Sequence, residues 1–227
     1  MSYEQAVSAL SEGRIDAGRE LISGVLVKNP KSQPALEVAI QICLHQNDLS
    51  GVHDYAKRLL EINPHHLPSA IALGNSYLLM GSPENISLDS FDGNTNADWL
   101  FLLASAYRGM GQIEFSRENL SNVKKIEGET IRYRQLLLEI NLEECKDPNL
   151  KLDLLNKEDI KKNDLDMKRF ILFKKARILD EIGEFDLAFR AASDAHVDAQ
   201  KVNVSIINNV TKTIINDLDR NLIQKLP

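Results

Sequence analysis

The first candidates for catalytic chemistry in this chain are four carboxylate side chains around a turn expected at Gly183. Paired carboxyl groups perform general acid and base catalysis only where burial separates their pKa values. Helix ends on a protein surface are hydrated, so we interpret this group as a solvated surface and predict no catalytic residue. The four residues are Asp180, Glu181, Glu184 and Asp186.

The histidines do not form a metal-binding pattern. His65 and His66 follow Pro64 in a predicted turn, and no cysteine or carboxylate cluster accompanies them, so a solvated pair is the favoured interpretation. The other three are His45, His53 and His196. The sequence contains no glycine-rich phosphate loop, no nucleophile elbow and no metalloprotease motif. We therefore expect no metal, no cofactor and no enzymatic activity in this chain.

Composition also removes several classes of partner. The net charge is −6, and aromatic residues make up 6% of the 227 residues, so a nucleic-acid partner is not expected. No apolar run approaches 18 residues, which predicts neither a membrane span nor a signal peptide. Cys43 and Cys145 are isolated within helical patterns, as is typical of reduced thiols in a cytoplasmic protein.

Turn-forming residues recur along the chain with a period of about 34 residues. Gly13, Asn47 and Gly81 are each 34 positions apart, and the same interval separates Pro30 from Pro64. Glycine, asparagine and proline are the residues that end helices and begin turns. A shared period of this length predicts repeated helical hairpins.

The interval changes in the second half of the chain. Gly111 follows Gly81 after 30 residues, and Gly183 follows 72 residues later, with the helix-breaking pair Asp147-Pro148 half-way between. Counting this pair, the chain has six predicted turns. The sequence therefore predicts about six helical hairpins of unequal length.

The third unit begins with the stretch Ala70–Gly81, AIALGNSYLLMG. Gly74 lets another helix approach closely, Tyr77 packs one turn further on, and Gly81 stands where the helix must stop. These residues resemble the first helix of a tetratricopeptide repeat. Other units have Ala104 and Ala176 at the small position, Tyr107 at the aromatic one, and Cys43 and Leu179 in place of an aromatic residue.

The resemblance implies an all-α fold, a right-handed α-solenoid of helical hairpins. We expect this array to cover residues 1–201, with a third unit that is shortened and a fifth that is irregular. The second helix of the third unit should be short or irregular, followed by an exposed loop from Asp89 to Asn96. Residues Asn94 to Asp98 should then cap the helix that contains Trp99.

Residues 202–227 are expected to form C-terminal capping helices. An open solenoid must cover the apolar face of its last unit, and this segment has apolar residues at helical spacing. They are Ile206, Ile207, Val210, Ile214 and Leu218. The alternative is that this apolar face contacts a membrane surface or another subunit. Formation of a homodimer is one form of that alternative.

A groove for a protein or peptide partner is implied by the same resemblance. The first helix of each repeat lines the concave face, so the residues on that face form the candidate site. They are Glu37, Gln41, His45, Ile71, Asn75, Leu78, Phe101, Ser105, Arg108, Phe173, Arg177 and Asp180. For Ile71, Phe101 and Phe173, packing on neighbouring helices is an equal alternative. Some tetratricopeptide repeats bind the terminal carboxylate of a chaperone through a set of basic residues. That set is missing from this sequence, so this activity is not predicted.

The end of the chain is similar to a narrower group. Gly183, Phe185, Asp186, Ala188 and Phe189 match the last unit of bacterial proteins in which such an array precedes a sulfotransferase domain. The resemblance implies an alternative function, a module that positions the acceptor or dimerises the enzyme. The catalytic domain would begin after residue 227, so no donor-binding residue is assigned.

Overall fold

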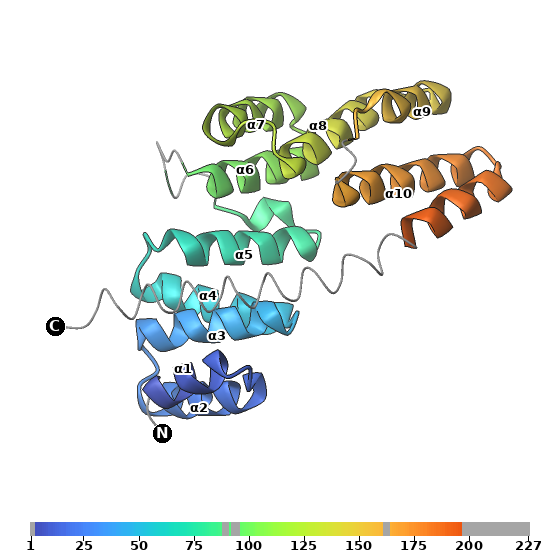
Figure 1. Ribbon diagram of the computed structural model, residues 1–227. Helices are drawn as coiled ribbons and strands as arrows, with labels where there is room; N and C mark the ends of the chain where they lie inside the picture. The colour runs from blue at the N-terminus through green and yellow to red at the C-terminus, as the bar shows by residue number, and fades with distance from the viewer. Residues whose placement is uncertain (1–2, 88–90, 92–95, 161–163, 197–227) are drawn as a thin grey trace. The chain divides into compact units, whose positions relative to one another are not determined.

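The computed structural model describes residues 3–87, 91, 96–160 and 164–196, and all regular structure in these ranges is helical (Figure 1). It divides into two compact units, Met1–Glu127 and Gly128–Pro227. The elements are α1 Tyr3–Ser11, α2 Ile15–Lys28, α3 Gln33–His45, α4 Leu49–Ile62, α5 Leu67–Leu79, the 3-10 helix η1 Pro83–Asn85, α6 Ala97–Gly109, α7 Ile113–Glu127, α8 Ile131–Glu144, α9 Pro148–Lys157 and α10 Leu165–Glu181. Residues 185–196 are also helical. The described part of the chain has no helix with the length and apolar character needed to cross a membrane.

In the first unit, each helix packs on its neighbours in the chain. Helices α1 and α2, α3 and α4, and α6 and α7 form hairpins, and further contacts join α2 to α3, α4 to α5 and α5 to α6. Figure 1 shows these helices stacked in the order of the sequence. The all-α prediction is confirmed for the described residues.

Five of the six predicted turns share one backbone geometry, whereas the sixth, at Asp147-Pro148, has Asp147 in an extended conformation with φ of −82°. Gly13, Asn47, Gly81 and Gly111 have φ between 55° and 75°, and Gly183 in the second unit has φ of 84°. In each turn the next residue's N–H donates to the carbonyl five positions earlier, at 2.8 to 2.9 Å. This is the Schellman ending of a helix, which requires a left-handed residue. The 34-residue spacing therefore marks equivalent turns.

The described residues of the third hairpin include no second long helix, as the sequence indicates. Between Gly81 and Asn96, the residues that the structure describes form only η1. The carboxamide of Asn96 then caps α6 by accepting from the N–H groups of Asp98 and Trp99, at 2.9 and 3.0 Å. The predicted loop from Asp89 to Asn96 lies outside the described residues, apart from its last residue and Phe91.

Close packing joins the third hairpin to the next one. Gly74 of α5 is buried, and a Cβ built on it would overlap Leu102 of α6. Trp99 and Leu102 are 2% and 1% exposed and form one apolar cluster with Ile86 and Ala106. The small residue predicted at position 74 is therefore needed for the approach of α5 to α6.

The second unit is built on α8, α9 and α10. Both expected helices of the irregular fifth hairpin are present, and the Asp147 carboxylate caps α9. Their apolar faces meet α10 in a cluster around Leu138, Leu155, Met167 and Ile171.

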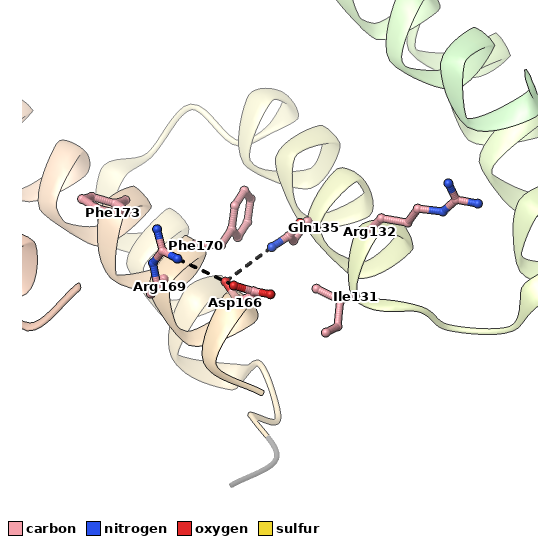
Figure 2. A pocket seen from close by; sticks show the side chains of 7 residues that line it. All are labelled: Ile131, Arg132, Gln135, Asp166, Arg169, Phe170 and Phe173. Atoms are coloured by element: carbon pink, nitrogen blue, oxygen red, sulfur yellow. Dashed lines mark hydrogen bonds and ion pairs between the residues drawn. The ribbon is translucent and has the colours of Figure 1, made fainter. Parts of the chain in front are cut away.

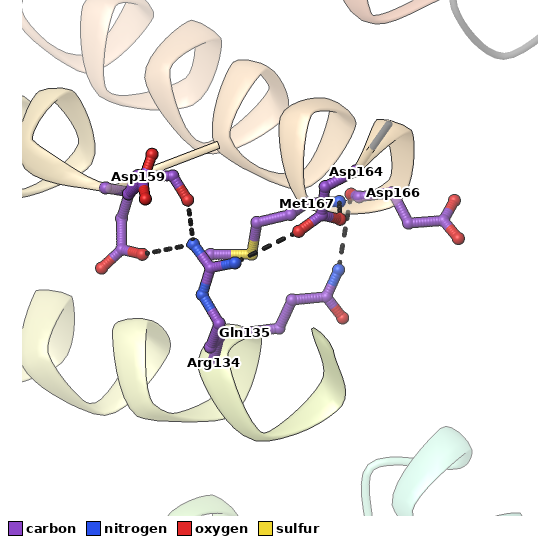
Figure 3. Close-up of polar contacts among 7 residues, drawn as sticks. Arg134, Gln135, Asp159, Asp164, Asp166 and Met167 are labelled. Carbon is purple, nitrogen blue, oxygen red and sulfur yellow. Dashed lines mark hydrogen bonds and ion pairs between the residues drawn. The ribbon is translucent and has the colours of Figure 1, made fainter. Parts of the chain in front are cut away.

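One arginine holds the connection between α9 and α10. Arg134 of α8 contacts the carboxylates of Asp164 and Glu158 at 3.1 and 3.2 Å and donates to the Asp159 carbonyl (Figure 3). The Arg134 and Asp164 side chains are only 18% and 9% exposed. Because Asp164 also caps α10, this contact fixes where α10 begins.

The last hairpin turns at Gly183. Its second helix buries small residues, Ala188 and Ala195, whereas Phe185 and Phe189 are 67% and 74% exposed. The predicted capping segment, residues 202–227, lies outside the described residues.

Candidate functional site

Four of the predicted groove residues meet in one groove of the first unit. Glu37 and Gln41 are one turn apart on α3, and Ile71 and Asn75 are one turn apart on α5. Together they line a groove of about 150 Å³ between these two helices. The arrangement arises because α3 and α5 are in contact, although α4 separates them in the chain.

The floor and rim of this α3–α5 groove have different chemistry. Ile40 and Ala72 are 4% and 7% exposed and form an apolar floor. Leu44 and Pro68 add exposed apolar surface at the edge. These residues were not predicted, although Glu37, Gln41 and Leu44 follow the i, i+4, i+7 spacing of one helix face, which could have identified Leu44.

A histidine holds the acidic side of the groove. His66 caps α5, where its Nδ1 accepts from the Ser69 N–H at 3.3 Å and lies 2.8 Å from the Ser69 hydroxyl. Its Nε2 lies 3.3 Å from the Glu37 carboxylate. Since Nδ1 accepts a hydrogen bond, the neutral ring with a proton on Nε2 satisfies these contacts.

The expected solvated histidine pair is therefore found only in part. His65 is exposed, but the His66 side chain is 19% exposed and structural. The contact leaves the Glu37 carboxylate, 45% exposed, as the charged group at the groove. His66 also lines the groove. It was not predicted, because the residues that usually cap a helix are Ser, Thr, Asp and Asn.

The other predicted residues of the first unit do not line this groove. His45 is exposed at the end of α3, and Leu78 packs with the cluster around Trp99. On α6, Phe101 and Arg108 are half-buried, and the Ser105 hydroxyl donates to the Phe101 carbonyl at 2.9 Å. Ile71 both lines the groove and packs with the Trp99 cluster. Both interpretations of this residue, groove lining and packing on a neighbouring helix, therefore apply.

The predicted residues of the second unit lie along α10. Phe173 is 39% exposed and lines a separate cavity of about 440 Å³ (Figure 2). Arg177 forms an ion pair with Glu181 at 3.1 Å and is 77% exposed, and Asp180 is exposed. The four carboxylates around Gly183 are all exposed, which confirms the prediction of a solvated surface.

Metal-ligating groups are not gathered in the described ranges. There, no three His, Cys, Asp or Glu residues are placed to hold a metal ion. Burial, with the nearby Asp48 carboxylate, raises the pKa of the Cys43 thiol to about 11. A thiol with this pKa is protonated at neutral pH and is a poor nucleophile. The α3–α5 groove is thus suited to binding through apolar contact, amide hydrogen bonds and one carboxylate.

No family model matches the chain, and the search of curated proteins found no match.

Proposed function

We propose that this chain is a tetratricopeptide-like α-solenoid that acts as a non-enzymatic interaction scaffold, and that its α3–α5 groove binds a short segment of a partner protein. One observation carries the proposal. Residues predicted at helical spacing on two separate helices, Glu37 and Gln41 with Ile71 and Asn75, line the same groove.

The groove chemistry indicates the kind of segment. The apolar floor at Ile40 and Ala72 suits one aliphatic side chain. Gln41 and Asn75 are exposed amides that can donate to and accept from a peptide backbone. The Glu37 carboxylate favours a lysine or arginine beside the aliphatic residue. The proposed partner segment is therefore an aliphatic residue flanked by a basic one, bound in the cytoplasm.

Peptide selection tests this proposal. A random peptide library would be selected on the full chain, and binding of the selected peptides would be measured by fluorescence anisotropy. We expect aliphatic-basic pairs to be enriched. Replacing Gln41 and Asn75 together by alanine should weaken binding by about 30-fold, since each lost hydrogen bond is worth about 1 kcal/mol.

The matched control is His45→Ala. It lies on α3, as Gln41 does, but outside the groove, and should leave the affinity unchanged. Selected peptides whose affinity does not respond to the double replacement would refute binding in this groove. Turnover of a substrate by the purified chain would refute the non-enzymatic part of the proposal.

A further inference from the structure

The cavity of the second unit has a different chemistry from the α3–α5 groove. It lies between α8 and α10 and has a volume of about 440 Å³. Its lining combines arginine, glutamine and aromatic side chains. The lining residues are Ile131, Arg132, Gln135, Asp166, Arg169, Phe170 and Phe173.

The Arg169 guanidinium is poorly hydrogen-bonded by its neighbours. Its Nε is buried, with no hydrogen-bond partner among the described residues. Its Nη1 lies 3.7 Å from the Asp166 carboxylate, which is too long for a hydrogen bond. A guanidinium has five N–H donors in a planar fork, and the Arg169 side chain is 29% exposed, so its two Nη groups have donors available for a ligand.

The other charged and polar groups at the cavity are directed elsewhere. Gln135 Nε2 donates to the Asp166 backbone carbonyl at 3.4 Å, which links α8 to the start of α10. Figure 2 shows the Arg132 side chain extending away from Asp166 and Arg169. The Asp166 side chain is 51% exposed, so the weak ion pair to Arg169 is easily exchanged for a better partner.

Apolar surface lies beside the arginine. Phe173 and Ile131 are 39% and 41% exposed, and Phe170 is half-buried and packs against the apolar cluster of this unit. Figure 2 shows Arg169, Phe170 and Phe173 together on α10. An ionic hydrogen bond is stronger where apolar groups exclude water, so a carboxylate bound here would gain from these neighbours.

We propose that Arg169 is the anchor of a second binding site, which takes a carboxylate next to an aromatic or aliphatic side chain in an acidic peptide segment. The carboxylate replaces Asp166 as the partner of the guanidinium and accepts two parallel hydrogen bonds. The adjoining apolar side chain lies against Phe170 and Phe173. The carboxylate comes either from an Asp or Glu side chain or from the end of a polypeptide.

Three short peptides separate these sources. Acetyl-Glu-Phe-amide offers a side-chain carboxylate, acetyl-Ala-Phe with a free terminus offers a main-chain carboxylate, and acetyl-Gln-Phe-amide is the neutral control. Each would be titrated into the full chain with ¹³C-labelled isoleucine methyl groups. We expect a saturable shift of the Ile131 methyl signal with at least one carboxylate peptide, and an affinity at least tenfold weaker for the neutral one.

Variants then test the anchor. Arg169→Gln should weaken binding at least tenfold, and Arg169→Lys should weaken it less, because lysine keeps the charge but loses the fork. Arg177→Gln, an exposed arginine on the same helix, is the matched control and should bind normally. If Arg169→Gln does not fold, the lysine variant and the comparison of the three peptides still test whether Arg169 binds a carboxylate.

The proposal is overturned if the three peptides shift Ile131 equally, if none shifts it, or if binding survives Arg169→Gln in the folded chain. Replacing Gln41 and Asn75 by alanine should leave this titration unchanged. Failure at Arg169 is therefore distinguishable from failure of the α3–α5 groove.

Discussion

Leu102 of α6 occupies the space where a side chain on Gly74 of α5 would begin. Leu102 is 1% exposed, so it has little room to move aside. The contact explains why a residue with poor helix propensity stands in the middle of α5.

Gly74→Ala should therefore destabilise the protein although alanine favours helices. Overpacking costs about 1–3 kcal/mol, and the gain in helix propensity offsets about 1 kcal/mol of it. Urea unfolding would measure the net loss. In a Leu102→Ala background the same replacement should become neutral or stabilising, and a loss of equal size there would contradict the steric explanation.

Arg134→Met should destabilise the second unit by about 3 kcal/mol, because it leaves the carboxylates of Asp164 and Glu158 partly buried without their cation. Thermal and urea unfolding of the full chain would measure this loss. Arg177→Met removes an exposed ion pair and should cost less than about 0.5 kcal/mol. Equal effects of the two replacements would show that Arg134 is not a structural contact.

Left-handed turn residues should tolerate only some replacements. Gly81→Ala and Asn47→Ala should each cost about 1 kcal/mol, because alanine has a steric penalty at positive φ. Asn47→Gly should stay within about 0.5 kcal/mol of the parent, since glycine adopts this conformation without strain. Chemical denaturation measures all three, with Ser50→Ala on the exposed face of α4 as the control.

The Cys43 thiol should react slowly in the folded protein. Cys43 is 2% exposed, and its pKa of about 11 keeps it protonated at pH 8. Iodoacetamide followed by mass spectrometry should modify the half-buried Cys145 first and Cys43 only on unfolding. Equal rates for both thiols in the folded chain would contradict this burial.

The same raised pKa has a consequence for stability. Above pH 9 the unfolded chain loses the thiol proton while the folded chain keeps it, so the free energy of unfolding should fall as the pH rises from about 9 to 11. Cys43→Ala should have a shallower decline over this range. A parallel decline in both proteins would assign the effect to other groups.

The turns of this fold could be predicted because few residues adopt positive φ. Gly13, Asn47, Gly81, Gly111 and Gly183 were placed by residue type and spacing together, and each has the same helix-ending geometry. The residue types at these positions are restricted by the backbone itself, so they remain visible in the sequence.

The contacts that join distant segments could not be predicted in this way. Arg134 meets Glu158 and Asp164 across 24 and 30 residues, and nothing in the local sequence pattern distinguishes it from an exposed arginine. The His66 contact to Glu37 likewise depends on how α5 lies against α3. Four of the ten residues that line the α3–α5 groove were predicted from helical spacing, but its rim at Leu44 and Pro68 depends on that packing too.

The chain-order contacts of the first unit also determine how it would respond to force. From α1 to α7, each helix touches the next, so pulling on residues 3 and 127 loads these interfaces one after another. Such an arrangement extends in small steps, each opening one hairpin, instead of rupturing at a single peak. The first unit should therefore extend at low force and refold when the force is removed.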